Sequence, residues 1–465
     1  MKKLLSFIFT IIFTINFSIG MIHTNTTVVN AATDSNGWPA GPSVYAKSAV
    51  LIDASTGTIL YDKKCHKKMY PASITKIMTA LLTIEKCKLD EEVVFSQNAV
   101  SSLNYDDANF GCQIGEKMSV KDCLYTLMLA SANEVATALA EHIAGSTDKF
   151  AEMMNVRAKE AGATNTHFVN ANGLHNTNHY VTAYDMAMIT RAASKYSVFN
   201  EIVNTTTYTV KANNKRKDSA QANQRHKMVW PTSGYYYDGI IGGKTGYTDQ
   251  SGTTLVTYAK RNGMTLIAVV LHSNGTNVYK DTKTLLDYGF DNFTLVNASQ
   301  KDTRFSTDDT TSLQSPFCTS TDLIYIDSES NIIIPKNFDF TKLTSQVQFN
   351  MSKDYFATIT YKLGDRSVGT ANLKYKSNTV SQKPTEETTK IQQTSAVSNT
   401  NDSSKETSKN DNSKKVKKDN KGIHLPDFLL PVIIIIVVVL FIISLIIMQQ
   451  RRLNKIRAMK RNRKR

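Results

Sequence analysis

Three short motifs place hydroxyl, amide and amine groups at spacings that suit nucleophilic chemistry. In chain order they are Ser73-Ile74-Thr75-Lys76, Ser131-Ala132-Asn133 and Lys244-Thr245-Gly246. A serine hydroxyl attacks an amide near neutral pH only when an adjacent base takes its proton. If Ser73 opens a helix, Lys76 lies about one turn away on the same face, within reach of the hydroxyl. The spacing therefore predicts a serine nucleophile with a lysine base, beside a helix N-terminus whose free N–H groups favour an oxyanion.

Each motif is weak on its own, because the chain contains other matches. Ser146-Thr147-Asp148-Lys149 also fits S-x-x-K, and both Ser96-Gln97-Asn98 and Ser102-Leu103-Asn104 fit S-x-N. Ser146 follows Gly145 and precedes a partly apolar run, which is typical of a helix N-cap. Residues 73 to 86 are instead apolar over most of a helix surface, which predicts a buried helix. A lysine on a buried helix indicates a functional role for Lys76. The alternative is that Ser73 caps this helix and Lys76 extends to solvent.

The apolar pattern indicates which elements position the motifs. Residues 49 to 61 predict a β-hairpin, and helices are expected to dominate from residue 73 to about 194. Ser119 and Asp122 form a predicted capping pair before the helical run that ends at the Ser131 motif, which places this motif on a loop between helices.

Three strands are predicted near the third motif, at residues 240 to 247, 253 to 258 and 264 to 271. The last two are joined at Asn262-Gly263, a strong hairpin signal. Lys244 and Thr245 then lie along a strand that can form one wall of a cleft, where Gly246 lets a substrate backbone approach closely.

The remainder of the chain divides by composition. We expect a catalytic domain at residues 32 to 292 and a small β-rich domain at residues 293 to 375, where short β-like runs carry no candidate catalytic cluster. Residues 376 to 427 begin with a long polar stretch that has too few apolar residues to fold, and we interpret them as a disordered tether.

The two ends of the chain resemble export and anchoring segments. Residues 1 to 31 combine two lysines, an apolar stretch and small residues near a cleavage point, which predicts a signal peptide; an uncleaved anchor is the alternative. Residues 428 to 448 carry no charge, and 21 residues at ~1.5 Å each match a hydrocarbon core of roughly 30 Å. The basic tail, residues 449 to 465, is then expected in the cytoplasm and the catalytic domain outside the cell.

Net charge and cysteine usage exclude some functions. The chain carries a net charge of +15, but residues 32 to 375 hold 34 Lys and Arg against 33 Asp and Glu. The basic excess therefore lies outside the predicted folded part, and no nucleic-acid partner is expected. The five cysteines show no C-x-x-C spacing, and we interpret them as small apolar fillers, with one disulfide possible.

With the three motifs, several longer stretches resemble one family, the low-molecular-mass penicillin-binding proteins of the D-alanyl-D-alanine carboxypeptidase type (serine peptidases, S11). These stretches are residues 48 to 61, 119 to 133, 166 to 185 and 242 to 252, and the resemblance covers roughly residues 40 to 375. The resemblance implies an α/β penicillin-binding/β-lactamase-like transpeptidase domain, an antiparallel sheet flanked by helices plus a helical subdomain, followed by the β-rich domain and a transmembrane helix. The middle motif departs from the family's usual sequence at two positions, Ala132 and Glu134, where the family commonly has Gly and Asp on either side of the Asn.

The resemblance also implies roles for the motif residues. Ser73 would be the nucleophile, Lys76 its base, and Ser131 a proton relay to the leaving amine. Asn133 would orient Lys76 and hold the substrate amide. Lys244 and Thr245, which lie beside Gly246 on the predicted strand, would bind the substrate carboxylate. The backbone N–H groups of Ser73 and Tyr247 would bind the oxyanion.

The activity implied is removal of the terminal D-alanine from peptidoglycan stem peptides, in cell-wall synthesis and remodelling, with β-lactams as covalent inhibitors and no cofactor or metal. A D,D-transpeptidase remains open, because the same acyl-enzyme can pass to an amine. A membrane-anchored β-lactam sensor has little room for an effector in residues 449 to 465. A class A β-lactamase would need a further glutamate, and a zinc D,D-peptidase would need a third ligand beside His175 and His179.

Overall fold

The structure is a computed structural model that describes residue 34 and residues 36 to 375, except residues 105, 306 to 323, 351 and 353. The predicted signal peptide (1 to 31), tether (376 to 427), transmembrane helix (428 to 448) and basic tail (449 to 465) lie outside the described residues, as does Cys318. None of the helices in the described part combines the length and the apolar character that crossing a membrane requires.

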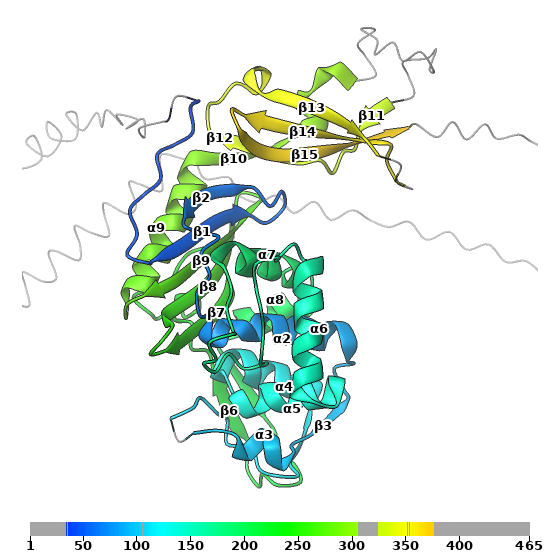
Figure 1. Cartoon of the computed structure of the whole chain (residues 1–465). Coiled ribbons are helices and arrows are strands. Elements are labelled where there is room, and N and C mark those ends of the chain that lie inside the picture. The colour runs from blue at the N-terminus through cyan, green and yellow to red at the C-terminus, as the bar shows by residue number, and fades with distance from the viewer. Residues whose placement is uncertain are drawn as a thin grey trace, which may run out of the picture. The chain divides into compact units, whose positions relative to one another are not determined.

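A five-stranded antiparallel sheet forms the centre of the region predicted as the catalytic domain (Figure 1). Its strand order is β2-β1-β9-β8-β7, so that the first strand of the chain pairs with a strand more than two hundred residues later. The bounds are β1 Ser48–Asp53, β2 Ile59–Lys63, β7 Ile240–Thr248, β8 Gly252–Arg261 and β9 Met264–Ser273. The turn between β8 and β9 uses Asn262 and Gly263, both at positive φ, as the predicted hairpin requires.

This sheet separates two hydrophobic cores, because its central strands are apolar on both faces. Alternate residues of β1 take opposite sides: Val50 contributes to the core beneath the helical subdomain, and Leu51 contributes to the core beneath α9 (Asn277–Asn292). Figure 1 shows α9 on one face of the sheet and α2, α7 and α8 toward the other. Strands β8 and β9 likewise pack against a hydrophobic core on each face.

The helical subdomain lies between β2 and β7 in the sequence. Its helices are α2 Lys76–Lys86, α3 Gln97–Ser101, α4 Val120–Tyr125, α5 Asn133–Ala144, α6 Thr147–Glu160, α7 Ala183–Ala193 and α8 Ser197–Asn204, with the turns η1 Ala72–Thr75, η2 Thr126–Ala130 and η3 Lys227–Val229. Two small hairpins accompany them, β3 Glu92–Val94 with β4 Lys117–Ser119, and β5 Thr207–Val210 with β6 Ala220–Asn223. The expectation of helices up to residue 194 was too simple, because residues 161 to 182 form turns in an Asn- and Thr-rich stretch.

Local sequence signals fix several helix ends as predicted. The Ser119 hydroxyl accepts the backbone N–H of Asp122 at 3.0 Å, which starts α4. The Ser146 hydroxyl accepts the backbone N–H of Lys149 at 3.3 Å, which starts α6. The second S-x-x-K match is therefore a helix cap, as its sequence context indicated.

A six-stranded antiparallel sheet follows, with the order β10-β12-β15-β14-β13 and β11 paired to β15. Its strands are β10 Phe293–Asn297, β11 Ile324–Ile326, β12 Asn331–Pro335, β13 Thr344–Phe349, β14 Ala357–Leu363 and β15 Arg366–Tyr375; the short helices α10 Ala298–Lys301, η4 Thr303–Phe305 and η6 Phe340–Lys342 connect them. The Trp38 ring lies 4.8 Å from the Phe293 ring, and both belong to the core beneath α9. The second sheet thus shares apolar packing with the first.

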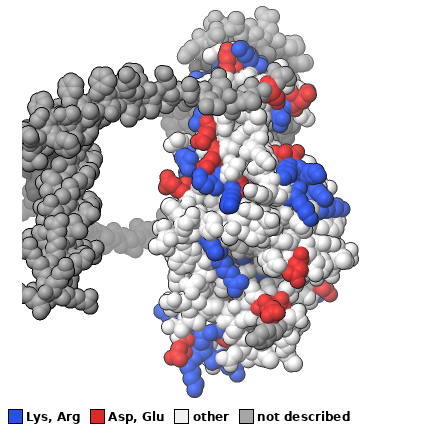
Figure 2. Space-filling model, turned by 90° about the vertical axis from the view of Figure 1, so that its left-hand side faces the viewer, with Lys and Arg blue, Asp and Glu red and all other residues white. Residues whose placement is uncertain are grey.

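The charged side chains of the described part include both signs in similar numbers, as the composition of residues 32 to 375 indicates. Figure 2 shows Lys and Arg interspersed with Asp and Glu on the face in view.

Cys65, Cys112 and Cys123 are buried in the helical core without a disulfide, which confirms their interpretation as apolar fillers. Cys87 is also unpaired but only partly buried.

Candidate active site

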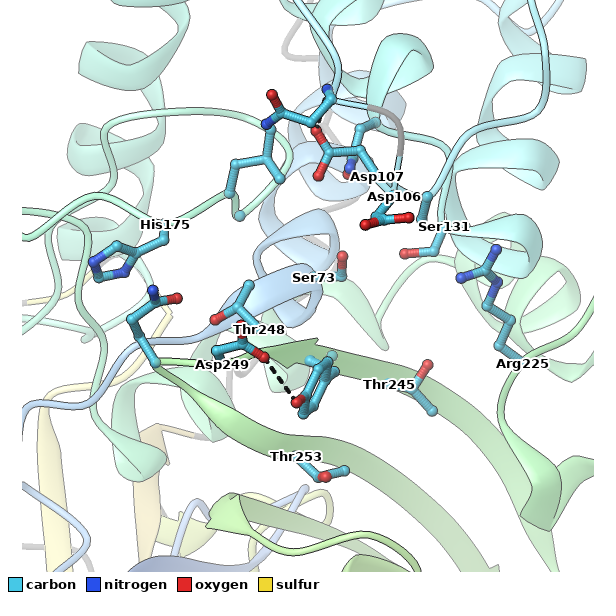
Figure 3. Close-up of a pocket in the computed structure, with 18 of the residues that line it drawn as sticks. Ser73, Asp106, Asp107, Ser131, His175, Arg225, Thr245, Thr248, Asp249 and Thr253 are labelled. Atoms are coloured by element: carbon cyan, nitrogen blue, oxygen red, sulfur yellow. Dashed lines mark hydrogen bonds between the residues drawn. The ribbon is translucent and has the colours of Figure 1, made fainter.

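A pocket of about 730 Å³ opens where the helical subdomain meets the edge strand β7. Six of the predicted site residues line it: Ser73, Ser131, Asn133, Thr245, Gly246 and Tyr247. Figure 3 shows the Ser73 and Ser131 hydroxyls facing the same space as Thr245. The two lysines of the motifs, Lys76 and Lys244, do not line the pocket and lie buried behind it, 0% and 1% exposed.

Ser73 lies in a tight turn rather than at the start of a regular helix. The turn η1 spans Ala72–Thr75, and α2 begins at Lys76. Ala72 has a φ of +53°, a region that side-chain-bearing residues rarely adopt. Backbone strain of this kind persists only when the surroundings hold it, and here the Thr254 hydroxyl donates to the Pro71 carbonyl at 2.8 Å. The turn brings the Ser73 hydroxyl to the pocket while Lys76 stays one helical turn behind it.

The Lys76 amine makes three hydrogen bonds at once. It donates to Ser73 Oγ at 2.9 Å, to Asn133 Oδ1 at 2.6 Å and to the Asn172 carbonyl at 2.7 Å. Burial, followed by the neighbouring Lys244 charge, lowers the pKa of Lys76 well below its usual value. A neutral amine has one lone pair in place of one N–H, so it can accept the Ser73 proton while keeping two hydrogen bonds.

The second motif lies at the junction of two helices. Ser131 follows the π-helical turn η2 with φ +65°, and Asn133 is the first residue of α5. This junction projects the Asn133 amide toward Lys76 and places the Ser131 hydroxyl, 3% exposed, in the pocket wall. The loop predicted between two helical runs is a single left-handed residue plus Ala132.

Glu134, which departs from the family's usual residue, has a structural role that the sequence did not reveal. It is 2% exposed, and its Oε1 accepts the backbone N–H groups of Phe110 at 2.6 Å and Gly111 at 3.1 Å. The segment just before these residues carries Asp106 and Asp107, which line the pocket (Figure 3). The Glu134 carboxylate therefore anchors a pocket loop to α5.

The third motif lies along the edge strand β7. The Lys244 amine donates to the Thr245 carbonyl at 3.0 Å, and burial, followed by the Arg225 charge, lowers the pKa of Lys244 to about 7. Thr245 faces the pocket. A Cβ on Gly246 would come within 2.9 Å of the Ser73 backbone nitrogen, so only glycine lets β7 pack this closely against the nucleophile turn.

Tyr247 also lines the pocket; it is 66% exposed, and its hydroxyl donates to Asp249 Oδ1 at 2.9 Å. Arg225 also lines the pocket, opposite Asp249 in Figure 3. Sequence reasoning missed this arginine because nothing in its neighbourhood has a recognisable spacing. It also missed the Asn172 carbonyl, since a backbone acceptor has no residue-type signal.

The two histidines considered as zinc ligands have different surroundings. His175 lines the pocket, whereas His179 is 1% exposed and its Nε2 lies 3.0 Å from the Thr75 hydroxyl. Burial lowers the pKa of His179 to about 3, so the ring is neutral near pH 7. Within the described residues, no third Cys, His, Asp or Glu ligand gathers with them.

An antiparallel sheet with helices on both faces, and a serine–lysine pair beside its edge strand, define a penicillin-binding, transpeptidase-like α/β domain followed by a second antiparallel β domain. The chain belongs to the D-alanyl-D-alanine carboxypeptidase family, Peptidase S11, whose sequence profile matches residues 35 to 275. This matched region begins just before β1 and ends just after β9, so it includes all three motifs.

Known relatives cover different shares of the chain. It is 36% identical over 255 residues to the Bacillus subtilis D-alanyl-D-alanine carboxypeptidase DacF, an alignment spanning 53% of this chain and 63% of that protein. The DD-transpeptidase of Streptomyces K15 superposes on 54% of this chain and 99% of its own, with 29% identity and a TM-score of 0.51. Penicillin-binding protein 5 from Haemophilus influenzae covers 72% of this chain and 98% of its own, with 25% identity and a TM-score of 0.58.

Proposed function

We propose that this protein is a serine D-Ala-D-Ala carboxypeptidase that removes the terminal D-alanine from peptidoglycan stem peptides. The observation that carries the proposal is the contact between Lys76 Nζ and Ser73 Oγ at 2.9 Å, with a buried amine whose pKa is lowered and a hydroxyl that opens to a pocket. Membership of the D-alanyl-D-alanine carboxypeptidase family supports the substrate class.

Acylation begins when neutral Lys76 takes the Ser73 proton and Oγ bonds to the carbonyl carbon of the penultimate D-alanine. The oxyanion that forms would face the backbone N–H groups of Ser73 and Tyr247, which are donors fixed by the fold. The C–N bond then breaks, and the proton that Lys76 took passes through Ser131 to the leaving amine, so that Lys76 is neutral again. Free D-alanine departs and leaves an ester on Ser73.

Deacylation reverses the same proton path. A water molecule gives a proton to Lys76 and its oxygen bonds to the ester carbon. The ester C–O bond breaks, and Ser73 recovers its proton. Because Asn133 and the Asn172 carbonyl hold the lysine throughout, the amine returns to the same position for the next cycle.

In this proposal, the substrate carboxylate binds at the wall of the pocket formed by β7. The terminal carboxylate would be held by the Lys244 charge and the Thr245 hydroxyl, and Asn133 would hold the substrate amide. Arg225, at the same pocket, adds a second positive charge. β-Lactams, which offer a carboxylate beside a reactive amide, would acylate Ser73 at the same place.

We also propose where the enzyme works. The apolar run 428 to 448 and the basic tail after it support an anchored, single-pass protein whose catalytic domain lies outside the cell, after removal of residues 1 to 31. This side of the membrane is where peptidoglycan is exposed. The role would be cell-wall remodelling.

D,D-transpeptidation is the second candidate, and the similarity to the Streptomyces K15 DD-transpeptidase favours it. The acyl-enzyme is common to both reactions, and only the acceptor differs. We expect hydrolysis to dominate, because the pocket is open to solvent beside Ser73 and water is the most abundant acceptor.

The test is to incubate the full-length chain, purified in detergent, with a pentapeptide ending in D-Ala-D-Ala, with and without an amine acceptor, and to quantify D-alanine and the peptide products by mass spectrometry. We expect equal amounts of D-alanine and tetrapeptide. Products that carry the amine would favour transpeptidation. Labelling by a fluorescent penicillin without D-alanine release would favour a sensor, and rapid penicillin turnover a β-lactamase.

A further inference from the structure

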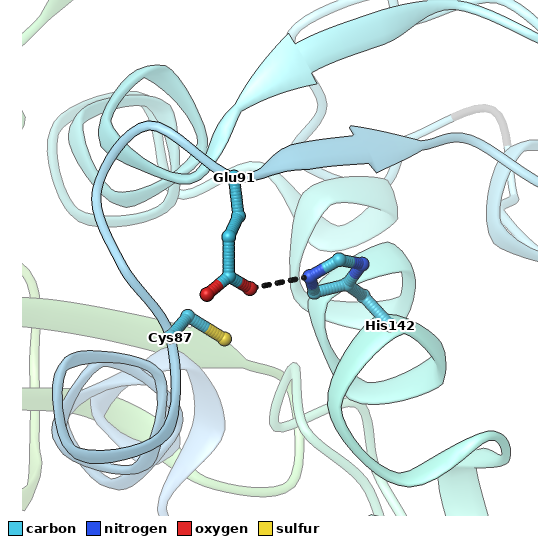
Figure 4. A group of neighbouring side chains, drawn as sticks. All are labelled: Cys87, Glu91 and His142. Atoms are coloured by element: carbon cyan, nitrogen blue, oxygen red, sulfur yellow. Dashed lines mark hydrogen bonds and ion pairs between the residues drawn. The ribbon is translucent and has the colours of Figure 1, made fainter.

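A second group of reactive side chains lies in the helical subdomain, away from the pocket residues. It comprises Cys87, the C-cap residue after α2, Glu91, just before β3, and His142, in the last turn of α5 (Figure 4). One ligand atom from each residue lies within 4.8 Å of the others. None of the three takes part in the proposed peptidase chemistry.

The geometry of the group suits a tetrahedral metal ion. Zinc bonds of about 2.0 to 2.3 Å place ligand atoms roughly 3.3 to 3.8 Å apart, and His142 Nε2 already lies 3.3 Å from Glu91 Oε2. The other carboxylate oxygen, Oε1, accepts the backbone N–H of Lys88 at 2.8 Å, which fixes the orientation of Glu91. Side-chain exposures of 26% for His142 and 39% for Glu91 leave room for water as a fourth ligand.

We propose that Cys87, Glu91 and His142 form a binding site for one zinc ion, completed by solvent. Thiolate, imidazole and carboxylate are the ligand types that zinc takes in proteins. On binding, the Cys87 S–H bond breaks, its proton leaves to solvent and the thiolate sulfur bonds to the metal; the imidazole binds in its neutral form.

The rival arrangement is a metal-free hydrogen-bonded group. Burial and the Glu91 charge raise the pKa of Cys87 to about 11, so in the absence of a cation the thiol keeps its proton beside the carboxylate. The 3.3 Å contact between Glu91 Oε2 and His142 Nε2 is then a partly exposed polar contact of the kind that adds little stability. The two arrangements differ in metal affinity and in the reactivity of the Cys87 sulfur.

The position of the group indicates what the ion would do. Helices α2 and α5 begin at the active site, where Lys76 and Asn133 are joined by a hydrogen bond of 2.6 Å. Cys87 and His142 lie at the opposite ends of the same helices, about 16 Å along α2 from Lys76. A zinc ion would fasten these ends and stabilise the subdomain without entering the reaction.

The experiment uses the full-length chain in detergent, freed of metal with a chelator. Zinc is titrated in competition with a chromophoric chelator, and cobalt is used as a spectroscopic probe of thiolate coordination. We expect one zinc ion per chain, a thiolate-to-cobalt charge-transfer band, and an affinity weakened about tenfold or more in both Cys87→Ser and His142→Asn. Zinc should also raise the melting temperature of the wild type and slow alkylation of Cys87, mapped by mass spectrometry.

His66→Asn is the matched control, since it removes an exposed histidine elsewhere and should bind zinc like the wild type. The rate of fluorescent penicillin labelling, expected to be equal in all variants, shows that each is folded. Zinc affinity that is unchanged in Cys87→Ser and His142→Asn, or a wild type that binds no zinc in competition with the chelator, would overturn the proposal.

Discussion

At the scale of single residues, the site depends on two buried lysines whose pKa values are both lowered. Burial is the main cause for each, because it makes an ammonium group costly; the neighbouring positive charge is that of Lys244 for Lys76 and that of Arg225 for Lys244. The effect suits their different tasks. In the proposed mechanism Lys76 is neutral and acts as a base, while Lys244, with a pKa of about 7, would be favoured in its charged form when a carboxylate binds.

Replacing Lys76 by methionine tests its role as the base. Methionine keeps most of the volume but offers no lone pair, so acylation by a fluorescent penicillin should slow by about 10² to 10⁴-fold, measured as the second-order labelling rate. Lys149→Met, in the second S-x-x-K match, is the control and should label at the wild-type rate. A Lys76→Met variant that folds and labels normally would assign the base to another group.

The lowered pKa of Lys244 predicts that kcat/KM falls as pH rises on the alkaline side. The pKa of Lys244 in the free protein is lowered to about 7, so the ammonium that we propose binds the substrate carboxylate is present below that pH and is lost as pH rises through it. On the alkaline side, kcat/KM for D-Ala-D-Ala peptides should therefore fall about tenfold per pH unit.

Lys244→Arg keeps its charge throughout this range. Its alkaline limb should move upward by at least one pH unit even if the maximal rate is lower, as measured in parallel kcat/KM profiles. An alkaline limb at the same pH in both proteins would mean that another group controls binding.

At the scale of secondary-structure elements, periodic segments were the most predictable from sequence. Strands β7, β8 and β9, the Asn262-Gly263 turn and the Ser119 and Ser146 caps all follow local signals and are confirmed. Local signals predict single elements and not how the elements are arranged. The fold class was predicted from the family resemblance instead.

Other parts of the site depend on contacts between distant segments, and the sequence did not predict them. The Asn172 carbonyl reaches Lys76 from a turn ninety-six residues away, and Glu134 holds a loop twenty-four residues upstream at Phe110. Neither contact has a periodicity or a residue spacing that a single sequence can reveal. The left-handed conformations of Ala72 and Ser131 were equally hidden, because neither residue type favours them.

The packing of β7 against the nucleophile turn predicts that Gly246→Ala is damaging. The added methyl group would lie 2.9 Å from the Ser73 nitrogen, so strand and turn must separate. Displacement of the oxyanion donors should slow penicillin labelling by roughly 100-fold. Gly234→Ala, whose methyl group meets nothing within 4 Å, should label and melt like the wild type. Equal labelling rates in the two variants would show that the close approach is unimportant.

At the scale of the whole molecule, the described residues contain the complete candidate site, whereas the predicted anchoring segments lie beyond them. We expect deletion of residues 422 to 465 to release the protein from membranes with its penicillin-labelling rate unchanged, because no site residue is lost. Fractionation of cells expressing the full-length and shortened chains checks this. Continued sedimentation of the shortened chain with membranes would instead point to an uncleaved anchor within residues 1 to 31.

The most direct measurement locates the covalent bond itself. The full-length chain is treated with a β-lactam and analysed by intact mass and peptide mapping, alongside Ser73→Ala and the control Ser146→Ala, and the same proteins are assayed for D-alanine release. We expect one adduct per chain, on Ser73, in the wild type and in Ser146→Ala, with neither adduct nor D-alanine from Ser73→Ala. An adduct on a different residue, or D-alanine release that persists without the Ser73 hydroxyl, would contradict the proposed acyl-enzyme.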